Sequence, residues 1–134
     1  MTFVSRQKVR FAHVDPAGIV FYPRYFEMLN AAIEDFFADH VGVDFRRMHL
    51  DRRLGVPTVK LETIFSAPSR LGDLLSFEIE VARTGQTSAD LRIDVMCADE
   101  HRLQISVVLV CMNLNTGRPV EWPADMRLGE MARA

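Results

Sequence analysis

The sequence contains little cysteine, because Cys97 and Cys111 are the only two among 134 residues. Each lies inside an apolar stretch, and their spacing matches no metal-binding motif. We therefore expect two buried thiols in a reducing compartment rather than a disulfide framework. A chain of this length can bury roughly two thirds of its unfolded surface, so it needs neither a disulfide nor a metal to fold.

Long apolar runs and blocks of positive charge are also missing. No stretch approaches the ~18 apolar residues of a membrane-spanning helix, and Met1–Arg10 lacks the apolar centre of a signal peptide. We therefore expect a cytoplasmic protein without a membrane span. The net charge of −2 and the lack of a basic block argue against nucleic acid as a partner.

Several motifs of known chemistry are absent as well. The sequence has neither a P-loop nor a dinucleotide-binding fingerprint. No two histidines have the spacing of metal ligands, so we treat His40, His49 and His101 as surface groups. Ser66 and Ser69 lack the glycine-flanked elbow of a serine hydrolase. The sequence therefore predicts no metal and no resident cofactor.

The composition is that of an ordinary globular protein, with 49% apolar and 25% charged residues and no repeat or linker. We expect a single domain over residues 1–134. From Arg24 to His40, apolar residues recur at helical spacing. The residues that would share the apolar face are Phe26, Leu29, Ile33, Phe36 and Phe37. Pro23 suits the first turn of this helix and Gly42 its end, whereas Val43–Gly55 predicts a loop or a short helix.

Four later segments alternate in the period of two that is typical of strands. The positions that would share one face are Val59, Leu61, Thr63 and Phe65; Leu75, Phe77, Ile79 and Val81; Ala89, Leu91, Ile93 and Val95; and Leu103, Ile105, Val107 and Leu109. Lys8–Phe11 predicts the end of a short first strand. The simplest arrangement is an α+β fold, in which a five-stranded antiparallel sheet wraps around one long central helix.

Such a sheet is too large for one helix to cover. Val108 and Val110 also place apolar residues on the outer face of the last strand. Both observations indicate that copies of the chain associate, so we expect a homo-oligomer, either a dimer or a tetramer.

The loop from Ala12 to Tyr22 is the segment best suited to chemistry, because it leads into a helix. A helix N-terminus offers free N–H groups and a partial positive charge, which can stabilise the oxyanion formed by attack on a thioester carbonyl. Asp15 in this loop could attack that carbonyl or activate a water. Gly18 lets backbone and ligand approach closely. Pro23 has no N–H, so Tyr22 is the expected donor.

Two alternatives concern the residues of this loop. An Asp-Pro in a glycine-containing loop is more often turn chemistry than a catalytic site. His13, two residues before Asp15, could orient the carboxylate or act as a base, and the competing interpretation is a loop histidine without a role.

The same loop carries a family resemblance. The run FAHVDPAGIVFYPRY, from Phe11 to Tyr25, resembles the signature of the hotdog-fold thioesterases, most closely the 4-hydroxybenzoyl-CoA thioesterase type. The resemblance continues through FSAPSRLGD (Phe65–Asp73) and GRPVEWP (Gly117–Pro123), in order along nearly the whole chain. It implies a hotdog fold and hydrolysis of an acyl-CoA whose acyl group is aromatic or otherwise apolar. Coenzyme A then enters as part of the substrate, and no other cofactor is implied.

The resemblance also implies catalytic roles and an assembly. Asp15 matches the catalytic carboxylate, acting as nucleophile or general base. The backbone N–H of Tyr22 matches the group that polarises the thioester oxygen. Gly18, Pro16 and His13 belong to the same matching run, with Pro16 expected at the substrate. In that family the active site lies at a dimer interface, so assembly and activity should be linked.

Departures from the family pattern concern the substrate. Asn30 stands where the hydroxybenzoyl enzyme has an acidic residue that contacts the substrate hydroxyl, which predicts little preference for a 4-hydroxybenzoyl over a benzoyl group. Thr84–Thr87 stands where that enzyme has a basic cluster for the CoA nucleotide, with Arg83 beside it. Arg118 matches a further basic position. We therefore expect Asn30 near the acyl group and Arg83 and Arg118 near the nucleotide.

Two rival functions remain open from the sequence. Hydration or dehydration of an acyl thioester by a hotdog protein needs a paired acid and base, and only His13 could pair with Asp15. A non-catalytic protein that binds acyl ligands needs neither residue. Intact Asp15 and Gly18 argue against this second rival, and the known hydratase signatures differ from this sequence.

Overall fold

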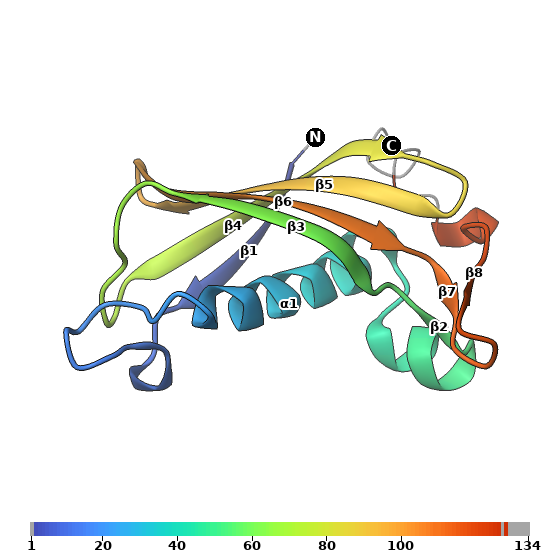
Figure 1. Cartoon of the computed structure of the whole chain (residues 1–134), viewed down its shortest axis with the longest axis horizontal. Coiled ribbons are helices and arrows are strands. Elements are labelled where there is room, and N and C mark those ends of the chain that lie inside the picture. The colour runs from blue at the N-terminus through green and yellow to red at the C-terminus, as the bar shows by residue number, and fades with distance from the viewer. Residues whose placement is uncertain (1, 127, 129–134) are drawn as a thin grey trace.

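The computed structural model describes residues 2–126 and 128. Its main element is a five-stranded antiparallel sheet in the order β1-β4-β5-β6-β3, which curves over the long helix α1 (Figure 1). The elements are β1 (Thr2–Lys8), α1 (Arg24–Phe36), β3 (Thr58–Phe65), β4 (Leu74–Thr84), β5 (Ser88–Cys97) and β6 (Glu100–Val110). The predicted α+β arrangement of a five-stranded sheet around one helix is therefore confirmed.

A small second sheet in the order β2-β7-β8 lies beyond the end of β6. Its strands are β2 (Leu54–Gly55), β7 (Met112–Asn113) and β8 (Arg118–Pro119). The predicted loop or short helix over Val43–Gly55 contains a helical turn at Arg47–Asp51, and then the strand β2. The sequence did not predict β2, because two residues are too few to show a period.

Helix α1 forms because apolar side chains recur along one of its faces. Its buried residues are Tyr25, Met28, Leu29, Ala32, Ile33 and Phe36. Pro23 precedes the first helical residue, and a π-helical turn, Phe37–Val41, continues the helix to Gly42. Gly42 has a φ of 91°, which ends the helix as predicted, because glycine reaches this left-handed region without strain.

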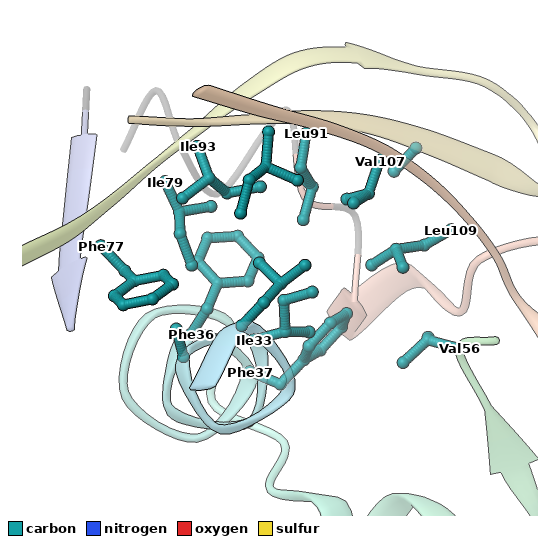
Figure 2. Packing of buried hydrophobic residues seen from close by; sticks show 14 of the residues in the cluster. Ile33, Phe36, Phe37, Val56, Phe77, Ile79, Leu91, Ile93, Val107 and Leu109 are labelled. Atoms are coloured by element: carbon teal, nitrogen blue, oxygen red, sulfur yellow. The ribbon is translucent and has the colours of Figure 1, made fainter. Parts of the chain in front are cut away.

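The core lies between α1 and the inner face of the sheet. Figure 2 shows Phe36 of α1 and the adjoining Phe37 pointing toward side chains of β4, β5 and β6. The alternating inner residues of these strands include Phe77, Ile79, Leu91, Ile93, Val107 and Leu109, each at most 1% exposed. The predicted alternation of these three strands is therefore confirmed.

The strand β3 differs from its predicted pattern. Thr63 is half-buried, but the other residues of the face predicted to be apolar are exposed: Val59 by 59%, Leu61 by 40% and Phe65 by 49%. The physical reason is the position of α1, whose nearest strands are β1 and β4 at the other side of the sheet. The described part of the chain therefore leaves much of the apolar inner face of β3 exposed.

The first strand also ends earlier than predicted. β1 stops at Lys8, and Phe11–His13 forms a 3₁₀ turn in which Phe11 is 82% exposed. Beyond Lys8 the chain leaves the ladder with β4 and bonds instead to the turn before it, because Val9 N–H donates to the Asp73 carbonyl at 2.8 Å. The prediction that the strand reaches Phe11 is wrong.

The turn from Pro68 to Asp73 is held by a charged pair. The Arg102 guanidinium donates to Asp73 Oδ2 at 2.7 Å and to the Pro68 carbonyl at 3.1 Å, and the Arg70 N–H donates to the same Asp73 oxygen at 2.9 Å. These bonds, the one from Arg70 N–H most strongly, hold the pKa of Asp73 below its usual range. The turn is therefore rigidly shaped, and it faces the loop that contains Asp15.

None of the helices within the described residues is both long enough and apolar enough to cross a membrane. The cytoplasmic location and the single domain over residues 1–134 stay predictions from the sequence.

We predict that Phe36→Ala lowers the free energy of unfolding by about 3–5 kcal/mol, because it removes a large side chain from a filled core. Urea unfolding with an unchanged slope would measure this loss. Phe11→Ala is the matched control, since Phe11 is 82% exposed, and it should change the value by less than about 0.5 kcal/mol. Equal effects of the two substitutions would contradict the described core.

We also predict that Asp73→Asn lowers stability at pH 7, and that the difference from the wild type shrinks in acid. The lowered pKa of Asp73 means that its carboxylate stabilises the fold above the unfolded-state pKa of about 3.9. That contribution is lost as the pH falls through the folded-state pKa. Urea unfolding between pH 7 and pH 3 checks this, with Asp51→Asn at an exposed position as control. A difference that stays constant over this range would contradict the prediction.

Candidate active site

The loop before α1 folds back on itself as a tight hairpin. Val14 pairs with Val20, Asp15 N–H donates to the Ile19 carbonyl at 3.0 Å, and Gly18 N–H donates to the Asp15 carbonyl at 2.9 Å. Gly18 has a φ of 80°, so a side chain there would be strained even though space is open around it. The glycine requirement predicted at this position is thus a backbone requirement.

The hairpin is also fixed from outside by the turn from Pro68 to Asp73. Val20 N–H donates to the Ser69 carbonyl at 2.9 Å, and Leu71 N–H donates to the Gly18 carbonyl at 3.3 Å. Ser69 is fully buried. The loop therefore keeps its shape through backbone bonds on both sides.

The Asp15 carboxylate lies half-buried in this hairpin. Its Oδ1 accepts a hydrogen bond from Ala17 N–H at 2.9 Å, which is the turn chemistry considered as an alternative from the sequence. Among the described residues, no group donates a hydrogen bond to its Oδ2. One oxygen thus orients the carboxylate, and the other is available to a ligand.

The first turn of α1 leaves one donor at its N-terminal end. Arg24 N–H donates to the Phe21 carbonyl at 2.8 Å, and Tyr25 N–H donates to the Tyr22 carbonyl at 3.2 Å. Pro23 has no N–H. Within the described part of the chain, Tyr22 N–H has no acceptor, so it can donate to a ligand at the positive end of the helix.

The His13 side chain is hydrogen-bonded within its own turn. Its Nδ1 accepts a hydrogen bond from Arg10 N–H at 2.9 Å, which caps the 3₁₀ turn, and its carbonyl accepts from Phe21 N–H at 3.0 Å. The described residues include no hydrogen bond between His13 and Asp15. Pro16 lies exposed at the tip of the hairpin.

Asn30 lies in a groove further along α1. The groove has a volume of about 270 Å³ and is bordered by α1, the Arg47–Asp51 turn and the small sheet. Its apolar lining residues are Ile33, Phe45, Val56, Pro57, Leu109, Met112 and Leu114. Polar side chains at the groove come from Asn30, His49 and Thr58, and Gly55 also lines it. His49 and Thr58 were not predicted from the sequence, although the spacing of four residues between Phe45 and His49 is typical of a helix.

The two predicted arginines lie at the end of the molecule opposite the Asp15 loop. Arg83 is exposed near the end of β4, opposite Asp90 in the ladder, and Arg118 is exposed on β8, opposite Asn113. Figure 1 shows the end of β4 and the strand β8 at one end of α1, and the loop before the helix at the other. One copy of the chain therefore brings together Asp15, Gly18 and Tyr22, but not Asn30, Arg83 or Arg118.

A second constellation lies near the end of β3. Ser66 Oγ is 3.2 Å from His101 Nδ1, and His101 Nε2 is 3.1 Å from Asp94 Oδ1, which are the residue types of a hydrolase triad. However, the N–H groups of Ser66 and Ala67 both donate to the Arg102 carbonyl, at 2.8 and 3.1 Å. They cannot also stabilise an oxyanion. This network therefore links strands and is not a hydrolytic centre.

No group of three His, Cys, Asp or Glu side chains gathers as a metal site within residues 2–126 and 128. Cys111 is buried, and burial raises the pKa of its thiol, whereas Cys97 is half-buried.

Known proteins are similar to this chain in sequence and in fold. A 4-hydroxybenzoyl-CoA thioesterase from Pseudomonas sp. (strain CBS-3) is 29% identical over 142 residues, covering 92% of this chain and 94% of the relative. A 1,4-dihydroxy-2-naphthoyl-CoA hydrolase from Thermosynechococcus vestitus is 32% identical over 78 residues, 58% of this chain and 53% of the relative.

Solved structures of thioesterases superpose on this chain over most of its length. A mutant of 4-hydroxybenzoyl-CoA thioesterase complexed with 4-hydroxybenzoyl-CoA superposes with a TM-score of 0.83 at 26% identity, over 98% of both chains. The structure of a gentisyl-CoA thioesterase superposes with a TM-score of 0.85 at 23% identity, over 93% of this chain and 99% of the other, and supports the fold alone. The predicted hotdog fold is confirmed.

The family model described as the Thioesterase-like superfamily matches residues 9–128. The match spans the Asp15 hairpin, α1 and every strand after β1. The predicted enzyme class, an acyl-CoA thioester hydrolase, is confirmed at the level of this superfamily. With its fold, its loop and about nine tenths of its length in agreement, this chain belongs to the Thioesterase-like superfamily.

Proposed function

We propose that this protein hydrolyses an aromatic or otherwise apolar acyl-CoA to the free acid and coenzyme A, with Asp15 as the catalytic carboxylate. The observation that carries this proposal is the Tyr22 N–H, which has no acceptor in the described chain and lies at the N-terminal end of α1. A thioester carbonyl placed there would have its developing negative charge stabilised by that N–H and by the helix.

Asp15 can act in either of two ways. As a nucleophile, its free oxygen bonds to the thioester carbon, the C–S bond breaks, and CoA leaves as a thiolate; water then hydrolyses the anhydride. As a general base, the carboxylate takes a proton from water, whose oxygen bonds to the same carbon, and the proton passes to the departing sulfur. The bond from Ala17 N–H to Oδ1 orients the group in both cases.

The relatives support the aromatic substrate class. Their names specify 4-hydroxybenzoyl and 1,4-dihydroxy-2-naphthoyl thioesters of CoA. The groove beside Asn30 is lined mostly by apolar side chains, which favour the binding of an aromatic ring. Arg118 lies on β8, which pairs with the strand β7 whose Met112 lines this groove, and we expect it to meet the phosphates of CoA. Arg83 is not among the residues that line the groove, and its role stays a prediction.

The groove is not lined by any residue of the Asp15 hairpin, which supports an active site shared by two copies. β3 is an edge strand that pairs only with β6, and its exposed residues include Val59, Leu61 and Phe65. An antiparallel pairing of two β3 strands would place the Thr58 end of one beside the Phe65 end of the other. Thr58 lines the groove, and Phe65 packs against Tyr22 with ring centroids 6.3 Å apart. The groove of one copy would then adjoin the Tyr22 N–H of its partner.

The charges on β3 favour the same pairing. A twofold axis at Leu61 would place Lys60 of each copy opposite Glu62 of the other, on the outer face of the joined sheet. The edge strand is therefore complementary to itself in charge as well as apolar in character. Association of such dimers into a tetramer stays a prediction.

The geometry of His13 disfavours the rival hydration reaction. That chemistry needs an acid and a base placed around two substrate carbons. His13 Nδ1 accepts from Arg10 N–H, and the described residues include no hydrogen bond between a histidine and Asp15. Hydrolysis needs the carboxylate and the helix end alone.

We predict that Asp15→Asn lowers kcat by at least about 10²-fold while the protein stays folded. The asparagine oxygen can still accept from Ala17 N–H, but it cannot act as a nucleophile or as a base near neutral pH. Release of free thiol from benzoyl-CoA and the melting temperature should be measured together. Asp39→Asn, at an exposed position after α1, is the control. A folded Asp15→Asn protein with turnover within a few-fold of the wild type would remove Asp15 from the mechanism.

We predict that Leu61→Lys yields a folded monomer with little activity, because it places two positive charges at the proposed twofold axis. Val4→Lys is the matched control: Val4 lies on β1 at the opposite edge of the sheet and is 37% exposed, against 40% for Leu61. Sedimentation at micromolar concentration and thioesterase activity give the two readouts. An active monomer, from either the variant or the wild type, would rule out the shared site.

A further inference from the structure

The groove beside α1 is lined by His49, whose Nε2 has no role in the catalytic proposal. Its walls are mostly apolar, and one of its polar side chains belongs to His49 on the Arg47–Asp51 turn. His49 was predicted to be a surface group. In the structure its side chain is half-buried and lines the groove.

The hydrogen bond of His49 determines which ring nitrogen faces a ligand. Its Nδ1 is 2.9 Å from the Phe45 carbonyl oxygen, which can only accept, so Nδ1 carries the proton. In the neutral ring, Nε2 then has a free lone pair. The Phe45 ring packs against the imidazole with centroids 4.8 Å apart and holds its orientation.

Gly55 and Leu114 lie beside Nε2 at the wall of the groove. A Cβ at Gly55 would lie 3.8 Å from His49 Nε2 and 2.9 Å from Leu114 Cδ2. Gly55 and Leu114 both line the groove, so Nε2 is next to its open volume. Within residues 2–126 and 128, Nε2 has no hydrogen-bond donor as partner.

A hydrogen-bond acceptor among apolar walls favours a ligand that brings a donor. An apolar acyl group in the groove would exclude water from Nε2 and leave it unpaired, which costs about 1–3 kcal/mol. A hydroxyl on the acyl group would restore the lost bond. Asn30 is exposed, so water can satisfy its amide whichever acyl group binds, whereas His49 is half-buried.

We propose that His49 Nε2 accepts a hydrogen bond from a hydroxyl of the acyl group, so that the groove selects hydroxylated aromatic acyl groups over unsubstituted ones. The inference rests on the proposed thioesterase function and assigns a specificity residue within it. It replaces the expectation, drawn from Asn30, of little preference for a hydroxylated ring. The acceptor is now His49 on the Arg47–Asp51 turn rather than a residue of α1.

The experiment compares benzoyl-CoA with its 2-, 3- and 4-hydroxy isomers in hydrolysis. In parallel, calorimetry measures the binding of benzyl-CoA thioethers with the same substitutions, which cannot be hydrolysed. We expect at least one hydroxylated isomer to exceed the unsubstituted compound about tenfold in kcat/KM and in affinity, equivalent to about 1.4 kcal/mol. The isomer series also identifies the ring position that reaches His49.

Two substitutions of His49 separate its two nitrogens. His49→Asn retains a donor for the Phe45 carbonyl but has no group at the place of Nε2, so the preference should fall to within twofold. His49→Gln offers an amide oxygen near that place and should keep part of the preference. Thr58→Val is the matched control, because it removes another polar group from the groove lining and should leave the preference unchanged.

The outcomes distinguish this inference from the proposed function. The inference is overturned if the wild type favours no hydroxylated isomer, or if a folded His49→Asn protein keeps the preference. Hydrolysis of all four thioesters at equal rates would overturn it and leave the thioesterase proposal intact. Preferential binding of a hydroxylated thioether, without hydrolysis of any thioester, would support the inference and contradict the catalytic proposal.

Discussion

Packing of the apolar face of α1 against the inner face of the sheet is the constraint on which the rest of the structure depends. Ile33 illustrates this, because it is part of the core and also lines the groove. The same helix carries the free Tyr22 N–H just before its first turn. Burial of one face of α1 therefore fixes a donor at its start and a groove wall at its middle, and neither can move without disturbing the core.

The Asp15 hairpin is held in a different way, through backbone hydrogen bonds rather than side-chain packing. Its own turn and the turn from Pro68 to Asp73 both bond to it, while Pro16, Ala17 and Gly18 are exposed. Arg102 stabilises the second turn from β6. The carboxylate is thereby positioned without being enclosed, which combines a fixed orientation with access for a large substrate.

The sequence predicted α1 and the strands β4, β5 and β6 well, because each is long enough to show its period. It could not predict β2, β7 or β8, whose two residues show none. For β3, the period identifies the residues that share a face but not whether a helix covers them. The Asp15 loop was predicted from its place before a helix, and its catalytic roles came from the resemblance to a family. The groove was missed, because Asn30, His49, Gly55 and Met112 meet only through the tertiary fold.

The two edges of the sheet differ in a way that bears on stability in solution. Ser5 on β1 is 4% exposed and donates to Asp35 Oδ2 of α1 at 2.6 Å, so this edge is tied to its own helix. The β3 edge carries exposed apolar side chains, and within the described residues no side-chain hydrogen bond links it to α1. Pairing through β3 would stabilise the folded chain by mass action, so its melting temperature would rise with protein concentration. Dilution alone would then weaken the fold, and an enzyme purified at high concentration would become most vulnerable to heat at the nanomolar concentrations used in activity assays.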